Sequence, residues 1–197
     1  MAKGTKSGVT FAELRALLGR PTTEPVFVAV MERASALGKV VYKPDFVIAK
    51  GAGFDFALGR PDDAKRNAPK VAETLFMFRD GRDKHRQFGD PPSGFAFTTR
   101  GELLAKLPAP VESWKVGKGK VPVETKDVDH DRWIVGGCDI SASYRDGEVE
   151  HLTASLSASG SASRSAAWRR RIHRCESSPI RKRARRCSPA WASSTST

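Results

Sequence analysis

The chain has 197 residues, a length that fits one domain or one double domain. Hydrophobic residues make up 39% of it, and its net charge of +12, if evenly spread, would suggest a nucleic-acid or membrane partner. No run of 18 apolar residues occurs, and no apolar stretch follows the basic residues of 1–10, so neither a membrane helix nor a secretory signal peptide is expected.

The positive charge is concentrated at the C-terminal end. Residues 158–197 contain ten Lys and Arg residues and one acid, Glu176, which gives this segment a net charge of +9. Residues 1–157 keep only +3 of the total, so the argument for a polyanionic partner applies to the final segment alone. Two of the three cysteines, Cys175 and Cys187, lie there without metal-ligand spacing. We expect no disulfide framework, which favours a reducing, cytoplasmic location.

Two helices are predicted before residue 40. Thr10 and Glu13 have the spacing of a capping box. In this motif the threonine hydroxyl accepts a hydrogen bond from a backbone amide of the first turn, and the glutamate carboxylate accepts one from the backbone amide of the threonine. This pattern predicts a short helix over residues 10–19. Apolar residues at helical spacing predict a second helix over residues 24–37.

After residue 39 the hydrophobic period becomes that of strands. Segments rich in β-branched and aromatic residues alternate with Gly, Pro and Asp, which favour turns, so we expect an antiparallel meander. Its strands are predicted at residues 40–42, 46–49, 54–58 and 71–78. The charged residues 79–94 are predicted to be a linker, with a tight hairpin turn at Asp80-Gly81 and a solvated His85.

The pattern of the first helix recurs after residue 95. Thr99 and Glu102 have the same capping-box spacing, and several other positions agree when the two helices are aligned. The matched pairs are Thr10 with Thr99, Glu13 with Glu102, Leu14 with Leu103, Ala16 with Ala105, Leu18 with Leu107 and Pro21 with Pro110. A structural repeat explains these matches, although any two capped helices share some of them.

Strand-like segments follow this helix as they follow the first. They are residues 121–123, 132–135, 139–144 and 148–156, and Asp146-Gly147 provides a second Asp-Gly turn. The predicted fold class is α+β, with two helix-plus-antiparallel-meander halves at residues 1–87 and 88–157.

The segment at residues 158–197 contains nine Arg, ten Ser and seven Ala and no Leu, Val or Phe. It cannot bury enough apolar surface to offset its chain entropy, so we predict a disordered basic tail. Two interpretations fit this composition. One is an out-of-frame translation of GC-rich coding DNA, and the other is a basic arm that binds nucleic-acid phosphates without reading sequence.

The motifs of catalysis and metal binding are incomplete. Residues 127–131 begin like a calcium loop, but Arg132 and Cys138 stand where an EF-hand needs Gly and Glu. Cys138 with His130 and His151 would suit a thiol nucleophile and its base, yet a lone Cys in an alternating strand is more often a small core residue. We therefore expect no metal, no cofactor and no enzymatic activity.

Residues 117–120 (Gly-Lys-Gly-Lys) lack the Ser or Thr and the helix that follow a phosphate-binding loop. They are predicted to form a flexible hairpin tip. Exposed loops on a rigid sheet often carry binding function, so this tip could meet an acidic partner.

Seven short segments form a pattern that extends over about residues 9–156. They are residues 17–21, 53–56, 88–95, 131–133, 140–144, 146–147 and 152–156. Together they resemble a loosely characterised set of bacterial proteins found near polymorphic toxins and secretion loci. The resemblance implies a cytoplasmic immunity or accessory protein that acts by binding. In outline, the halves are also similar to β-lactamase-inhibitory proteins and to the BamE-like outer-membrane assembly fold.

The main hypothesis is a non-enzymatic immunity protein that neutralises a cognate toxin through the exposed sheet face and the loops around residues 115–132. Trp114 and Trp133 are candidate anchors, since large aromatic residues dominate interface energetics, although both would fit a core equally well. The candidate partner-binding residues are Trp114, Lys118, Lys120, Asp129, Asp131 and Trp133. The alternatives are nucleic-acid binding through the tail and an enzyme with an unrecognised site.

Overall fold

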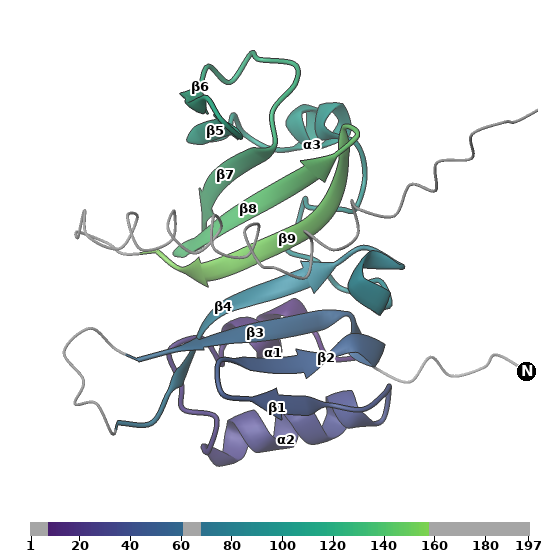
Figure 1. The fold of residues 1–197 in the computed structure, drawn as a ribbon, viewed down its shortest axis with the longest axis vertical. Coiled ribbons are helices and arrows are strands. Elements are labelled where there is room, and N and C mark those ends of the chain that lie inside the picture. The colour runs from purple at the N-terminus through teal and green to yellow at the C-terminus, as the bar shows by residue number, and fades with distance from the viewer. Residues whose placement is uncertain (1–7, 61–67, 158–197) are drawn as a thin grey trace, which may run out of the picture. The chain divides into compact units, whose positions relative to one another are not determined.

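The computed structural model describes residues 8–60 and 68–157 (Figure 1). The tail predicted to be disordered, residues 158–197, lies outside the described residues. The described part of the chain forms one antiparallel sheet of nine strands with three α-helices, so the fold is mostly β with a few helices. None of the helices in this part is long and apolar enough to cross a membrane.

The helices begin where the sequence places their caps. They are α1 (Phe11–Arg15), α2 (Pro25–Ser35) and α3 (Arg100–Lys106). Both predicted capping boxes are present: Thr10 with Glu13 caps α1, and Thr99 with Glu102 caps α3. The local sequence signal is therefore sufficient to locate these two helix starts.

α1 is shorter than predicted because the chain leaves the helix to join the sheet. Leu18 forms an isolated parallel bridge with Ala72, and the Gly19 amide donates to the Ala72 carbonyl at 2.7 Å. Gly19 has a φ of +81°, a conformation that commonly ends a helix. Leu14, Leu17 and Leu18 are all buried, so the predicted apolar stripe reaches the core although only its first part is helical.

The strands follow the predicted segments closely in the first half and less closely in the second. They are β1 (Val41–Lys43), β2 (Phe46–Ala49), β3 (Phe54–Gly59), β4 (Val71–Phe78), β5 (Glu112–Lys115), β6 (Gly119–Val121), β7 (His130–Val135), β8 (Cys138–Arg145) and β9 (Glu148–Leu156). Two short 3-10 helices, η1 (Lys50–Ala52) and η2 (Arg82–Lys84), follow β2 and β4. The sequence pattern does not predict β5, and it places β6 two residues too late.

Of the two Asp-Gly pairs, one forms a hairpin turn in the structure and the other does not. Asp146 and Gly147 join β8 to β9 with φ values of +54° and +79°, as a tight hairpin turn requires. Asp80-Gly81 does not join paired strands, because the chain continues from it into η2. The prediction of a hairpin at Asp80-Gly81 is therefore wrong.

The pairing of β4 with β9 joins the two halves. The strand order is β1-β2-β3-β4-β9-β8-β7-β5-β6, and each neighbouring pair is antiparallel. The last strand of each half thus lies beside the other, with Leu75 opposite Ala154 and Met77 opposite Leu152. The halves at residues 1–87 and 88–157 share one sheet and one hydrophobic core.

The register assigns the strand residues to two faces, since directly opposite side chains point the same way. One row consists of Ala49, Phe54, Met77, Leu152, Ala142, Asp131, Ser113 and Val121. A neighbouring row on the same face consists of Val47, Phe56, Leu75, Ala154, Ile140 and Trp133. Apart from Val121, which is half-buried, all of these residues are buried.

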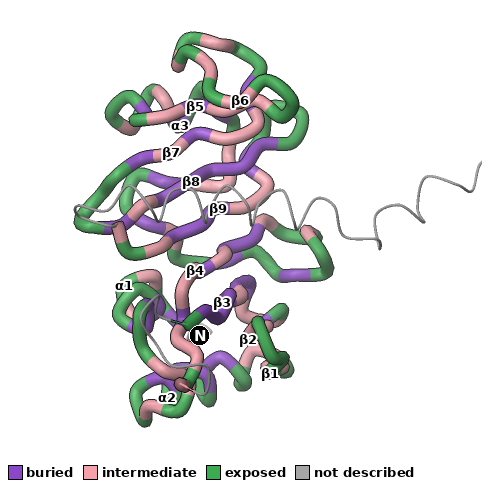
Figure 2. Tube along the Cα trace, turned by 60° about the vertical axis from the view of Figure 1, so that its left-hand side comes forward, coloured by how far each residue is buried: buried purple, intermediate pink, exposed green. Residues whose placement is uncertain are grey.

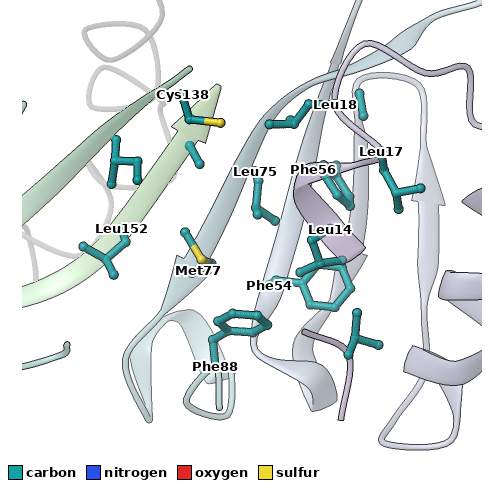
Figure 3. Close-up of a cluster of buried hydrophobic side chains, with 14 of the residues drawn as sticks. Leu14, Leu17, Leu18, Phe54, Phe56, Leu75, Met77, Phe88, Cys138 and Leu152 are labelled. Carbon is teal, nitrogen blue, oxygen red and sulfur yellow. The ribbon is translucent and has the colours of Figure 1, made fainter. Parts of the chain in front are cut away.

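The α-helices cover the face that these rows form. The rings of Phe27 on α2 and Phe56 have centroids 5.6 Å apart, and Leu14 of α1 lies in the same buried cluster (Figure 3). Arg100 of α3 donates to Asp131. Burial is greatest along the central strands and falls toward the edge strands β1 and β6 (Figure 2). Within residues 8–60 and 68–157, no α-helix covers the opposite face.

Gly53 allows the segment after β4 to cross the end of β3. Its φ is +81°, and a Cβ there would lie 2.5 Å from the Arg86 carbonyl oxygen and 2.6 Å from the Phe88 nitrogen. These are backbone atoms, which cannot rotate away. The Phe88 amide also donates to the Phe78 carbonyl at 3.0 Å, so the crossing segment is fixed. Glycine is required here by both conformation and space.

We expect Gly53→Ala to lower the free energy of unfolding by about 3 kcal/mol or more, because a left-handed alanine is combined with backbone overlap. Gly147→Ala is the matched control: its φ is +79°, but nothing lies within 4 Å of the added Cβ. That variant should lose only about 1 kcal/mol. Denaturant unfolding of both variants measures the difference, and equal losses would show that the crossing segment relaxes freely.

Candidate functional site

The face opposite the helices carries polar and aromatic side chains, and we define this polar face by two rows of opposed residues. One row is Asp55, Phe76, Thr153, Ser141, Arg132 and Glu112. The other is Phe78, His151, Ser143, His130, Trp114 and Lys120. Both rows cross the β4–β9 pair, so the polar face belongs to both halves.

Aromatic rings gather where β4 meets β9. Phe76 and Phe78 stack with centroids 6.4 Å apart, and the His151 ring lies 6.3 Å and 6.1 Å from them. His85, from the segment after β4, stacks on Phe78 at 3.9 Å and is buried. The prediction of a solvated His85 is therefore wrong, because this stacking and a 2.8 Å contact with Asp55 hold the ring in the fold.

Glu150 lies beside this group, at the irregular position of β9 where the β8–β9 register shifts. Arg82 and Arg145 approach its Oε1 at 2.8 Å and 2.9 Å, and His151 Nδ1 lies 3.8 Å from its Oε2. Burial opposes ionisation of Glu150, but His151 and the two arginines outweigh it and lower the pKa of Glu150. Arg82 thereby ties the segment after β4 to β9.

His130 and Ser143 form a pair within the polar face, with Nδ1 2.8 Å from the hydroxyl oxygen. Burial first, and then repulsion from His151, lower the pKa of His130 to about 4. The ring is therefore neutral at pH 7. A general base works best when its pKa is near the working pH, so His130 is poorly matched to activating Ser143.

The charges at the β5–β7 end of the polar face neutralise one another. Arg132 lies 2.7 Å from Asp139 and 3.4 Å from Glu112, and Lys120 lies 3.2 Å from Glu112. Burial opposes ionisation of Glu112, but hydrogen bonds from Lys120 and Trp114 and the charge of Arg132 lower its pKa. Two cations meet two carboxylates, so neither sign is in excess here.

β5 and β6 pair as an antiparallel hairpin, which confirms the hairpin predicted around residues 117–120. Lys118 is exposed at the tip. The Val116 amide donates to Asp129 Oδ2 at 2.6 Å, and Lys115 pairs with Asp127. The carboxylates of Asp127 and Asp129 therefore hold the hairpin in place and do not point toward a common metal position. The described part of the chain contains no cluster of three possible metal ligands.

Asp131 is fully buried on the helix-covered face. Its carboxylate accepts hydrogen bonds from Arg100 Nε at 2.6 Å, from the Ser113 hydroxyl and from the Tyr144 hydroxyl at 3.0 Å. Burial, together with the Asp131 charge, raises the pKa of Tyr144. A carboxylate in this position cannot touch a partner protein, so the expectation that Asp131 contacts a partner is corrected.

Arg100 connects this buried network to the loop before β7. Its two terminal nitrogens donate to the carbonyls of Thr125 and Val123 at 2.6 Å and 2.8 Å. The sequence analysis did not single out Arg100. One local signal marks it: a cation in the first turn of a helix opposes the helix dipole, which suggests that another interaction requires it.

Trp133 is also a core residue, with 2% of its surface exposed. Its Nε1 donates to the Pro108 carbonyl at 2.9 Å, and Phe95 meets its ring edge to face at 5.3 Å. The expectation that Trp133 anchors a partner is therefore corrected in favour of the core alternative. Along its strand half-buried and buried positions alternate from His130 to Trp133, and Trp133 lies on the helix-covered face with Asp131.

The other four candidates lie at or near the surface of one end of the sheet. Trp114 is half-buried on the polar face between His130 and Lys120, and its Nε1 lies 3.4 Å from Glu112. Lys120 is mostly exposed, Lys118 is at the hairpin tip, and Asp129 fixes the hairpin.

Cys138 is buried on the helix-covered side, opposite Leu156 of β9. His130 and His151 belong to the polar face, so the sheet separates the thiol from both rings. Cys138 is a core residue, as the alternating strand pattern favours.

Comparison with family models, curated proteins and solved structures gives no match to this chain.

The depressed pKa of His130 makes stability depend on pH. An unfolded histidine titrates near pH 6.5, so between about pH 6.5 and 4 the unfolded chain binds the extra proton and the folded one does not. The free energy of unfolding should therefore fall by about 3 kcal/mol over that range. Denaturant unfolding against pH, with wild type and His130→Gln, tests this; an equally steep fall in the variant would assign the effect to other groups.

Proposed function

We propose that this protein is a non-catalytic binding protein that engages a protein partner through the polar face and the β5–β6 hairpin. The single observation that carries the proposal is the one-sided placement of the helices. α1, α2 and α3 all pack on the apolar rows, which leaves a sheet face of polar and aromatic side chains without helical cover in the described part of the chain.

Trp114 is the best-placed anchor on this face. It lies at the end of the row nearest the hairpin, half-buried, with the exposed Lys120 opposite it. Tryptophan is one of the residue types enriched in binding hot spots, and contacts that contribute little energy usually surround such an anchor. The Arg100 network below holds the neighbouring loop through two carbonyls, so this end of the face is preorganised.

The resemblance to proteins encoded near polymorphic toxins supports a bacterial toxin as the partner, and with it the role of a cytoplasmic immunity protein. The low pKa of His130 supports a non-catalytic role, because the one histidine–serine pair on the polar face lacks an effective base at neutral pH. The two halves would then act as one binding surface, since both contribute strands to it.

The first test is to capture a partner with the full-length protein. The second is to co-express the protein with the captured partner and to measure whether growth is rescued. Trp114→Ala should abolish capture and leave the thermal midpoint nearly unchanged, because the side chain is half-exposed. Trp133→Ala is the matched control: removing a buried tryptophan should cost about 3–5 kcal/mol of stability. Unchanged capture by a folded Trp114→Ala variant would contradict this face as the binding surface.

The second candidate function is nucleic-acid binding through the basic tail. The observation that favours it is the net charge of +9 in residues 158–197, where Arg and Lys occur in clusters. Such binding would be independent of sequence and would involve phosphates alone, with no requirement for the polar face.

Replacing Arg181, Lys182, Arg183, Arg185 and Arg186 with glutamine in the full-length chain tests this alternative. If the tail binds DNA, affinity should fall by about tenfold or more and the salt dependence should become shallower, since fewer counterions are released. Fluorescence anisotropy with two unrelated DNA sequences at several salt concentrations measures both. Undiminished binding by the variant would exclude this cluster as the binding element.

A further inference from the structure

The side of the sheet that carries the polar face becomes apolar over its first two strands. Val41 of β1 lies opposite Ile48 of β2. Ile48 lies opposite Asp55, whose next neighbour in the same row is Phe76. Phe46, two residues before Ile48 in β2, points to the same side of the sheet. We define Val41, Phe46, Ile48 and Phe76 as the apolar patch.

The apolar patch is separate from the hydrophobic core. Its four side chains are half-buried, and none of them belongs to the core cluster or to the residues that pack against it. The α-helices in the described part of the chain cover the other side of the sheet. Contiguous apolar side chains that partly face solvent are a common mark of an interaction surface.

Cations gather at the end of the patch where β1 begins and β2 ends. Lys50 Nζ donates to the Asp83 carbonyl at 2.8 Å, and the Arg86 amide donates to the Lys50 carbonyl at 2.9 Å. Gly38 lies against Gly51, since a Cβ on Gly38 would be 2.9 Å from the Gly51 Cα. These contacts bring together four residues with exposed cationic side chains, which we define as the cation cluster: Lys39, Lys50, Lys84 and Arg86.

The cation cluster lacks carboxylate partners. No ion pair within residues 8–60 and 68–157 involves any of its four side chains. Asp83, which precedes Lys84, pairs with Arg82 instead. The opposite end of the polar face differs, because carboxylates neutralise Lys120 and Arg132 there. Positive charge is therefore in excess beside the apolar patch.

We propose that the apolar patch and the cation cluster form one docking surface for a protein segment with apolar and acidic side chains. The apolar side chains of that segment pack on the patch, and its carboxylates pair with the cluster. The inference rests on the proposed function, because the segment belongs to the same protein partner. It adds the chemistry by which the β1–β2 end of the sheet recognises that partner.

Charge selects this occupant over those that the chain itself offers. Residues 158–197 have a net charge of +9, so the cluster repels them. A second copy of the chain, with a net charge of +12, is disfavoured in the same way. Val41 and Ile48 offer no ring on which a base can stack, which favours a protein over a single-stranded nucleic acid.

A random peptide library displayed on phage and selected on the full-length protein at low ionic strength tests the proposal without a known partner. We expect the selected peptides to be enriched in Asp and Glu together with large apolar residues. Raising the salt concentration from about 50 mM to about 500 mM should weaken their binding by about tenfold, since exposed charges are then screened. Selected peptides without an excess of acidic residues, or a library that yields no binder, would overturn the proposal.

Variants of the full-length protein locate the peptide site. Lys39→Glu should raise the dissociation constant of the selected peptides by about threefold to tenfold, because it reverses one charge of the cluster. Ile48→Thr keeps the β-branched shape but removes apolar surface, and it should weaken binding as well. The matched control for Lys39→Glu is Lys106→Glu, which changes an exposed lysine of α3 and should leave peptide binding unchanged.

Fluorescence anisotropy measures these affinities, with a labelled single-stranded DNA as the comparison probe. If Ile48→Thr does not fold, Lys39→Glu still decides, because the lysine is exposed. Peptide affinity that Lys39→Glu leaves unchanged contradicts the docking surface. So does a Lys39→Glu variant that weakens only the binding of DNA, because nucleic acid would then be the occupant.

The outcomes also separate this surface from the proposed function. Capture of a natural partner that Trp114→Ala abolishes and Lys39→Glu leaves intact would uphold the function and reject the surface. Selected peptides that depend on Lys39 and Ile48, with no natural partner captured, would uphold the surface and reject the function as proposed.

Discussion

The pairing of β4 with β9 is the constraint on which the rest of this structure depends. Four registered pairs, from Leu75 with Ala154 to Phe78 with His151, connect two meanders that are otherwise local in the sequence. Once the two last strands pair, the helices of both halves lie on the same side, and Met77 and Leu152 become the centre of a shared hydrophobic layer.

This one-sided layer also explains where the polar groups are. A buried carboxylate is unfavourable unless it is fully hydrogen-bonded, and Asp131 meets this condition through Arg100, Ser113 and Tyr144. The network lies at the far end of the helix-covered face, where α3 offers only a short apolar surface. On the opposite face Arg132 is paired with Asp139 and Glu112, and His130 with Ser143, while Trp114 and the ring cluster around Phe78 add aromatic surface.

Local features could be predicted from the sequence, and long-range ones could not. Both capping boxes, the strands around Phe56 and Leu75, and the Asp146-Gly147 hairpin depend on residues close in the chain, and they are found as predicted. β5 could not be predicted because Glu112 to Lys115 show no apolar alternation, and its partner strand β7 lies beyond a loop. A repeat of the two halves stays a prediction.

The side of the sheet to which a residue points was the main uncertainty for the candidate site. Asp131 and Trp133 are two residues apart and so share a face with each other, while Trp114 belongs to the opposite one. Sequence periodicity establishes that such residues alternate but not which set meets the helices, since both sets contain a tryptophan and polar groups. His85 was equally difficult, because its acceptors Asp55 and Arg82 meet only after the chain has turned around the end of β3.

The two ends of the sheet have a consequence for self-association. β1 and β6 are only three residues long, and proline follows each of them directly, at Pro44 and Pro122. Each also carries an exposed lysine, Lys43 or Lys120. A strand edge that is short, charged and ended by proline offers few free amides to another chain. Both edges of the sheet are thus protected from pairing edge to edge with another copy of the chain.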